Sequence, residues 1–107
     1  MDAVEIMLTV KTRMWREGKT WIADCPALGV VVQMDTEAAA RKEFGVVVKS
    51  VLEISKEQGT FAQLMQHAAS HPETLWQPVQ HRTKMVEVGV PVPVSYLAGQ
   101  YAQQKAA

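Results

Sequence analysis

Alternation of hydrophobic and polar residues dominates the first part of the chain. From Val4 to Trp15, side chains of different character occupy the even and the odd positions. A period of two over this length predicts a half-buried β-strand with two distinct faces. The even face holds Val4, Ile6, Leu8, Val10, Thr12 and Met14, and the odd face holds Glu5, Met7, Thr9, Lys11, Arg13 and Trp15.

The next residues predict a hairpin followed by a third strand. Residues 17–19 provide a turn, in which Gly18 can adopt a positive φ. Residues 20–25 predict the second strand, which Pro26 ends. Residues 28–33 are rich in β-branched side chains and predict a short third strand.

A long amphipathic helix is predicted from about Glu37 to Lys56. Asp35 and Thr36 precede it, and either side chain can accept a hydrogen bond from the free amides of a first helical turn. Gly59 is suited to end this helix, because helices commonly close on a glycine with positive φ. The apolar stripe at helical spacing consists of Ala40, Phe44, Val47, Val48, Val51 and Leu52.

A second, short helix is predicted after Thr60. Thr60 and Gln63 have the spacing of a capping box, in which two side chains satisfy the free backbone amides of a helix start. Pro72 ends this helix, because the residue before a proline disfavours helical geometry. The mostly polar stretch from residue 73 to residue 84 predicts a loop.

The C-terminal part of the chain predicts an edge strand. Valines alternate with other residues from Met85 to Val94, which indicates a strand with one apolar face. Pro91 and Pro93 lie two residues apart, so both remove donors from the same edge and leave the other edge free to pair. Ser95 is placed to cap a last short helix, and the strand and this helix together span residues 84–104.

The composition fits one ordinary globular domain. The chain has 107 residues, 48% hydrophobic and 21% charged, which allows a modest core. Eleven basic residues balance eleven acidic ones, so no overall charge attracts nucleic acid. One cysteine excludes an internal disulfide and favours a reducing compartment. The chain start has no basic or apolar run, and no apolar run is long enough to span a membrane, so we expect a cytoplasmic protein without membrane contact.

Few residues suggest reaction chemistry. His67 and His71 have the i, i+4 spacing that can bring two imidazoles to one metal, although a pair of surface histidines is the simpler interpretation. Cys25 could be a nucleophile, but a small half-buried residue at a strand end explains it better. Asp24 and Asp35 flank the third predicted strand and could form a carboxylate pair. No phosphate loop, nucleophile elbow or zinc spacing occurs, so we expect no enzyme, no cofactor and no catalytic or metal-binding residue.

Two tryptophans and two basic residues are the candidates for contact with a partner. Trp15 shares the odd face with Lys11 and Arg13, and Trp21 follows in the second predicted strand. Large aromatic side chains on a mostly polar face are either covered by another element or anchor an interface. With the other basic residues of the hairpin, they could instead bind nucleic acid by stacking and charge, which requires a steep salt dependence.

The segment from residue 18 to residue 39 resembles the HicB-like antitoxin family. It reads Gly-Lys-Thr-Trp-Ile-Ala-Asp-Cys-Pro-Ala-Leu-Gly-Val over residues 18–30 and Asp-Thr-Glu-Ala-Ala over residues 35–39. The resemblance covers roughly the first seventy residues. Met34 stands where the family usually has glycine, and residues 84–104 resemble only the beginning of the C-terminal ribbon–helix–helix module of many members.

The predicted elements indicate an α+β fold with an antiparallel sheet of three to four strands, one long helix packed on it and short C-terminal helices. The resemblance implies a β-β-β-α core that is likened to a partial RNase H fold. It implies one HicB-like domain over residues 1–107, with a core at 3–70 and the edge strand and helix at 84–104.

The same resemblance implies an antitoxin that binds and neutralises a small HicA-type mRNA-cleaving toxin. The alternatives are a nucleic-acid-binding transcriptional regulator and an orphan HicB-fold oligomer of unknown role. Open sheet edges favour pairing between chains, so a homo-oligomer, either a dimer or a tetramer, is also expected.

Overall fold

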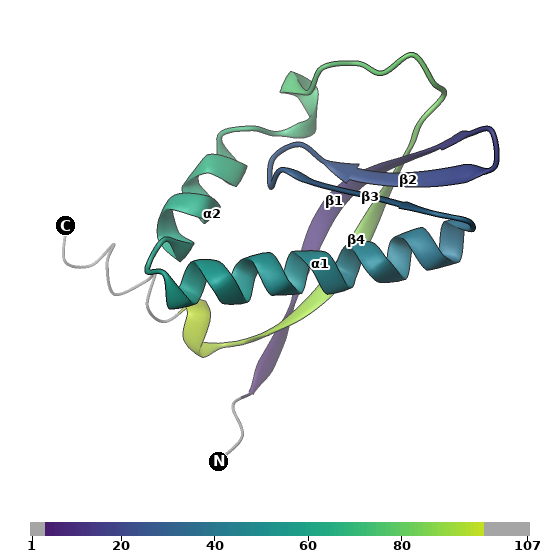
Figure 1. Cartoon of the computed structure of the whole chain (residues 1–107). Helices are drawn as coiled ribbons and strands as arrows, with labels where there is room; N and C mark the ends of the chain where they lie inside the picture. The colour runs from purple at the N-terminus through teal and green to yellow at the C-terminus, as the bar shows by residue number, and fades with distance from the viewer. Residues whose placement is uncertain (1–3, 98–107) are drawn as a thin grey trace.

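The computed structural model describes residues 4–97, in which one long helix packs on a four-stranded antiparallel sheet (Figure 1). The elements are β1 (Glu5–Glu17), β2 (Thr20–Cys25), β3 (Val30–Met34), α1 (Glu37–Glu57), α2 (Phe61–Ala69), the 3-10 helix η1 (Glu73–Leu75) and β4 (Lys84–Pro93). The predicted α+β fold with its β-β-β-α order is confirmed. A helical turn begins at Ser95, and the remainder of the predicted last helix lies outside the described residues.

β1 is the central element of the sheet, and it changes partner along its length. The strand order is β3-β2-β1-β4, with β1 paired to β4 over residues 5–14 and to β2 over residues 13–17. Only Arg13 and Met14 therefore have a strand on both sides. In Figure 1, β1 runs across the sheet while the β2–β3 hairpin lies beside its second half alone. Among the described residues, the first half of β1 is therefore paired with β4 on one side and has no strand on the side of β2.

The predicted division of β1 into two faces is confirmed. The even face belongs to the apolar core or packs against it, and the odd face points to the other side of the sheet. Thr12 is buried on the even face, where its hydroxyl donates to the carbonyl of Val10 at 3.0 Å, so the core contains no unpaired hydroxyl there. Sheet and helices bury a continuous apolar cluster that includes Met14, Ala23, Cys25, Val30, Val32, Ala40, Phe44, Val48, Leu52, Phe61, Val88, Val90 and Val92.

Both ends of α1 close as the sequence predicts. Of the two candidate caps, Thr36 acts, because its hydroxyl oxygen accepts from the amide of Ala39 at 3.0 Å. At the other end Gly59 has a φ of 75°, and the amide of Thr60 donates to the carbonyl of Ser55 at 2.8 Å. This pattern satisfies carbonyls that the end of a helix would otherwise leave free.

The predicted capping box of α2 is wrong. Thr60 precedes α2, but its side chain caps no amide of that helix, and its hydroxyl instead donates to the carbonyl of Ser55 at 3.4 Å. The backbone of Thr60 has a ψ of 12°, and its amide takes part in the closure of α1. An N-cap typically has extended geometry, which Thr60 lacks.

The third strand begins two residues later than expected, at Val30. The amides of the two preceding residues donate to the carbonyls of Cys25 and Pro26, at 3.1 and 3.2 Å. These bonds form a tight turn directly after β2. The turn ends the pairing between β2 and β1, so it is the local reason why β2 is short.

β4 is an edge strand, as its prolines predict. The amide of Val94 donates to the carbonyl of Val4 at 2.9 Å. Because amides alternate between the two sides of a strand, that of Val92 also points to β1, and the nitrogens of Pro91 and Pro93 face the outer edge. The prolines therefore cost no hydrogen bond inside the sheet.

Phe44 provides a test of this core, because it is fully buried between α1 and the sheet. Phe44→Ala removes apolar contacts and leaves a cavity, so we expect the free energy of unfolding to fall by about 3–5 kcal/mol. Urea denaturation followed by circular dichroism measures the change. Val46→Ala, at a position 53% exposed on the same helix, is the matched control and should change it by less than about 0.5 kcal/mol. Equal losses in the two variants would contradict the packing described above.

Candidate partner-binding site

Residues 71–83, which we call the strap, cover the odd face of β1 near the β1–β2 hairpin. The ammonium group of Lys11 donates to the carboxylate of Glu73 at 2.8 Å, and the guanidinium of Arg13 donates to the carbonyl of Gln77 at 2.6 Å. The hydrogen bond between Lys11 and Glu73 raises the pKa of Lys11 and lowers the pKa of Glu73. The predicted loop is therefore fixed to the sheet, and it contains the short helix η1.

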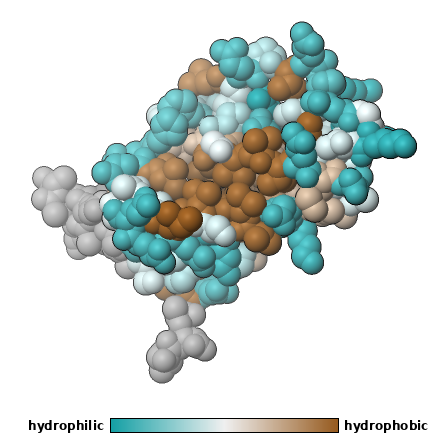
Figure 2. Space-filling model, viewed as in Figure 1, coloured by the Kyte–Doolittle hydropathy of each residue, from teal (hydrophilic) through white to brown (hydrophobic). Residues whose placement is uncertain are grey.

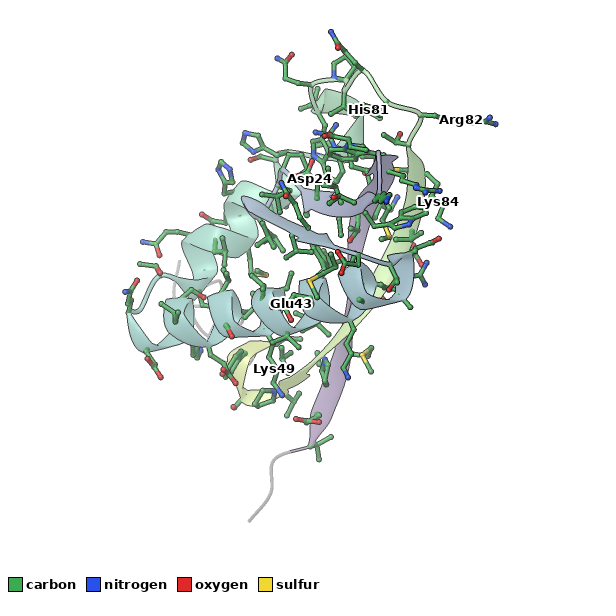
Figure 3. The ribbon with its side chains drawn as sticks, turned by 45° about the vertical axis from the view of Figure 1, so that its right-hand side comes forward. Asp24, Glu43, Lys49, His81, Arg82 and Lys84 are labelled. Atoms are coloured by element: carbon green, nitrogen blue, oxygen red, sulfur yellow. The ribbon has the colours of Figure 1, made fainter. Side chains whose placement is uncertain are left out.

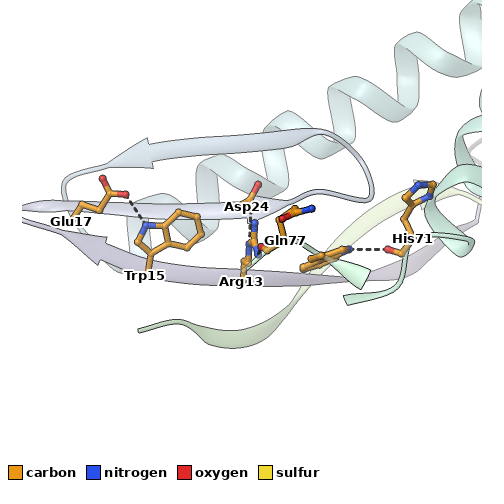
Figure 4. A network of polar contacts seen from close by, with 7 residues as sticks. Arg13, Trp15, Glu17, Asp24, His71 and Gln77 are labelled. Carbon is orange, nitrogen blue, oxygen red and sulfur yellow. Dashed lines mark hydrogen bonds and ion pairs between the residues drawn. The ribbon is translucent and has the colours of Figure 1, made fainter. Parts of the chain in front are cut away.

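Arg13 joins two strands and the strap (Figure 4). Its Nε donates to Oδ2 of Asp24 at 2.6 Å, and the two side chains are only 13% and 15% exposed. The guanidinium carbon also lies 5.6 Å from the ring centroids of both Trp15 and Trp76, within the range of cation–π contact. Arg13 is thus occupied inside the chain and has little surface left for a partner.

The four residues predicted to contact a partner are divided between the two faces of the sheet. Lys11, Arg13 and Trp15 share the odd face, as expected, and the strap is the element that covers that face. Trp15 is buried, and its indole donates to the carboxylate of Glu17 at 2.9 Å. Trp21 lies on the opposite face, since it pairs across from an even-numbered residue of β1, and it packs against the core. A partner-binding role for these residues stays a prediction.

The groups considered for reaction chemistry lie apart or are already engaged. The rings of His67 and His71 stack with centroids 4.0 Å apart, and residues 4–97 contain no group of three side chains that could hold a metal ion. Burial raises the pKa of the Cys25 thiol, which favours its unreactive protonated form. Asp24 pairs near the start of β3 and Asp35 follows its end, about 13 Å further along the strand.

A cavity of about 380 Å³ lies beside the first half of β1, on the side where β2 has ended. We call it the β1 groove. The end of α1, one face of α2, the turn after β2 and the start of the strap form its walls, which are mainly apolar. Side chains that line it include Leu28, Leu52, Met65, Ala68, Pro72 and Trp76.

An apolar surface also extends over the front of the molecule. Figure 2 shows hydrophobic residues gathered over α1 and over the space between α1, α2 and the β2–β3 hairpin. A hollow of about 440 Å³ between the two helices is lined by Val51, Ile54 and Leu64 among others. Large exposed apolar patches are uncommon on monomeric proteins and mark sites of association. Residues from two helices and a turn build this surface, so no single segment of the sequence predicts it.

A third hollow, of about 360 Å³, is lined by basic residues and lies near the turn of the β1–β2 hairpin. Arg16, Arg82 and Lys84 line it together with both tryptophans of the hairpin, and Figure 3 shows Arg82 projecting away from the sheet. Lys84 forms an ion pair with Glu37. Of the residues considered for nucleic-acid binding, Trp15, Arg16 and Trp21 line this hollow, whereas Lys11 and Arg13 lie outside it and contact the strap.

Comparison with known proteins gave no match, whether against protein-family models, curated proteins or solved structures. The resemblance to HicB-like antitoxins therefore depends on the residues quoted for it. The turn at Met34 needs no glycine, because no non-glycine residue in the described range 4–97 has a positive φ. Within the same range, no helix combines the length and the apolar character that crossing a membrane would require.

Arg13→Met tests whether this arginine anchors the strap. The substitution keeps the aliphatic stem but leaves Asp24 without its partner, which in a fully buried pair costs about 3–5 kcal/mol. Because both side chains are partly exposed, we expect a loss of about 2 kcal/mol in the free energy of unfolding. Trypsin should also cleave faster after Arg82, since the strap loses its bond at Gln77.

Arg16→Met is the matched control, because this exposed residue lies in the same strand and, within residues 4–97, its side chain bonds only to a turn carbonyl. It should change the free energy of unfolding by no more than about 0.5 kcal/mol and leave the cleavage rate unchanged. Similar losses and similar cleavage rates in both variants would show that Arg13 does not hold the strap.

Proposed function

We propose that this chain is a protein-binding module of the HicB-like antitoxin kind, which neutralises a small HicA-type mRNA-cleaving toxin by covering it. The observation that carries the proposal is the apolar β1 groove, which lies beside the half of β1 that has no pairing with β2. Apolar recesses with a few polar groups are the usual form of a binding site. The resemblance of residues 18–39 to HicB-like antitoxins supplies the class of partner.

The charges of the chain support a protein partner over a nucleic acid. Lys11, Arg13 and Lys84 each contact a carboxylate of the same chain. Binding to phosphates would have to break these pairs before it released any counterions. In contrast, a partner that covers an apolar groove removes apolar surface from water, which favours binding without breaking any ion pair.

The gene beside the one that encodes this chain provides the test. We expect it to encode a small basic protein that arrests growth when expressed alone. Co-expression of this chain should restore growth, and the two proteins should elute together from gel filtration. A neighbouring product that forms no complex with this chain, or an arrest that co-expression does not relieve, would contradict the proposal.

Two substitutions in α2 test whether the β1 groove takes part in that complex. Met65→Lys places a charge in the apolar wall of the groove, whereas Gln66→Lys places it at the next, exposed position. Met65→Lys should abolish rescue and co-elution, and Gln66→Lys should retain both. Thermal unfolding of both variants confirms that each still folds.

The outer edge of β4 supports a second proposal, that two copies of the chain pair there. Before Pro91, the amides of Met85, Glu87 and Gly89 face outward, and no partner for them lies within residues 4–97. Open edges of this kind pair readily with another strand. Light scattering should give a dimer or tetramer for the wild type and a smaller species for Glu87→Pro. A monomeric wild type would contradict this pairing.

A further inference from the structure

We propose that the β1 groove binds an extended peptide segment, which adds as a new strand to the unpaired edge of β1. The inference rests on the proposed function, because it assigns the contact with the partner to this groove and defines its chemistry. The residues that would receive the new strand are Thr9 and Lys11, which line the groove, and Met7, which follows on the same edge of β1.

The direction of the main-chain groups of β1 follows from its pairing with β4. The carbonyl of Val4 accepts from β4, so the main-chain groups of the even residues point toward β4 and those of the odd residues point away from it. From Arg13 onward, the odd residues bond to β2. Before Arg13, the main-chain groups of the odd residues have no strand of the described range beside them, because β2 ends at Cys25. Pro26, the residue that follows β2, has no amide to donate.

Three successive odd residues therefore present free donors and acceptors along this edge of β1, and two of them, Thr9 and Lys11, line the groove. Within residues 4–97, the amides and carbonyls of Met7, Thr9 and Lys11 make no hydrogen bond to another main-chain or side-chain group. Such groups recur about every 6.6 Å along a strand, since each residue advances the chain by about 3.3 Å. Another extended backbone has the same repeat, which a helix lacks, so a strand is the matching ligand.

The walls of the groove define which side chains the added strand would carry. Residues opposite Leu8 and Val10 would lie on the even side of the sheet, toward Leu52, Met65 and Ala68. Those positions favour apolar side chains of small or medium size. The residues between them would lie on the odd side, where polar groups are tolerated. The expected ligand is a peptide with an apolar residue at every second position.

The groove is present before any ligand binds. Its outer wall is the start of the strap, which the Lys11–Glu73 ion pair ties to β1. The indole of Trp76 donates to the carbonyl of His71 at 2.8 Å and fixes the fold of that wall. A pre-formed site loses less conformational entropy on binding than a site that must first be ordered. The volume of about 380 Å³ is typical of ligand pockets.

Thr9→Pro tests the strand addition directly. It removes one amide that faces the groove and leaves the bonds between β1 and β4 in place. The probes are a phage library of random 12-residue peptides and synthetic copies of the enriched sequences. Enriched peptides should alternate in hydrophobicity, bind the wild type, and lose about tenfold in affinity for Thr9→Pro, the effect of one or two hydrogen bonds.

Glu87→Pro is the matched control, because it removes an outward amide from the edge of β4 and not from the groove. Its affinity for the enriched peptides should stay within about twofold of the wild type, well below the cost of one hydrogen bond. In the wild type, peptide should slow hydrogen exchange of the Met7, Thr9 and Lys11 amides. Peptides with N-methyl groups at alternate residues test the same bonds without changing the protein, and they should not bind.

Several results would overturn the inference: no enriched peptide, binding that Thr9→Pro leaves unchanged, or full binding of the N-methylated peptides. These results are distinct from failure of the proposed function. If Thr9→Pro still rescues growth and forms the toxin complex, the chain is an antitoxin whose partner docks elsewhere. If peptides bind at the β1 edge but the neighbouring gene product does not bind, the groove is a strand-binding site in a protein of another function.

Discussion

The exchange of partners along β1 is the constraint on which the rest of this structure depends. β1 has thirteen residues and β2 has six, and the pairings with β2 and β4 overlap only at Arg13 and Met14. Met14 is fully buried at this point, so α1 packs on one continuous surface although the strands beneath it differ. The same overlap leaves one edge of β1 unpaired toward α2, which creates the β1 groove.

Arg13 is the other residue of β1 that pairs with both β2 and β4, and its side chain lies on the opposite face of the sheet from Met14. Its bonds to Asp24 and to the carbonyl of Gln77 connect β1, β2 and the strap. A partly buried ion pair adds little net stability compared with an apolar pair of the same size, because both charges lose water. Its directional bonds, however, fix where the strap lies. The strap in turn forms the outer wall of the groove, so Arg13 shapes a site that it does not line.

The sequence predicted the features that depend on neighbouring residues. Alternation in β1 gave both faces, Thr36 and Gly59 gave the ends of α1, and Pro91 and Pro93 gave the outer edge of β4. The face on which Trp21 lies could also have been predicted from the sequence, because the two-residue turn pairs Glu17 with Thr20 and so fixes the register of the hairpin. The strap and the groove were not predictable in this way. They depend on contacts such as Lys11–Glu73 and Arg13–Gln77, between residues 62 and 64 positions apart.

The two long edges of the sheet differ in a way that links the fold to recognition. Proteins usually protect open edges with proline, with charge or with a covering element. Pro91 and Pro93 protect only the second half of the outer edge of β4, whereas the half of β1 that lacks β2 has no proline, and its one lysine is engaged by Glu73. A longer β2 would have formed hydrogen bonds with the free main-chain groups of β1, but the chain has a proline and a tight turn at that place. The free donors and acceptors of Thr9 and Lys11 therefore face a mainly apolar recess, where a matching strand would form hydrogen bonds that are shielded from water.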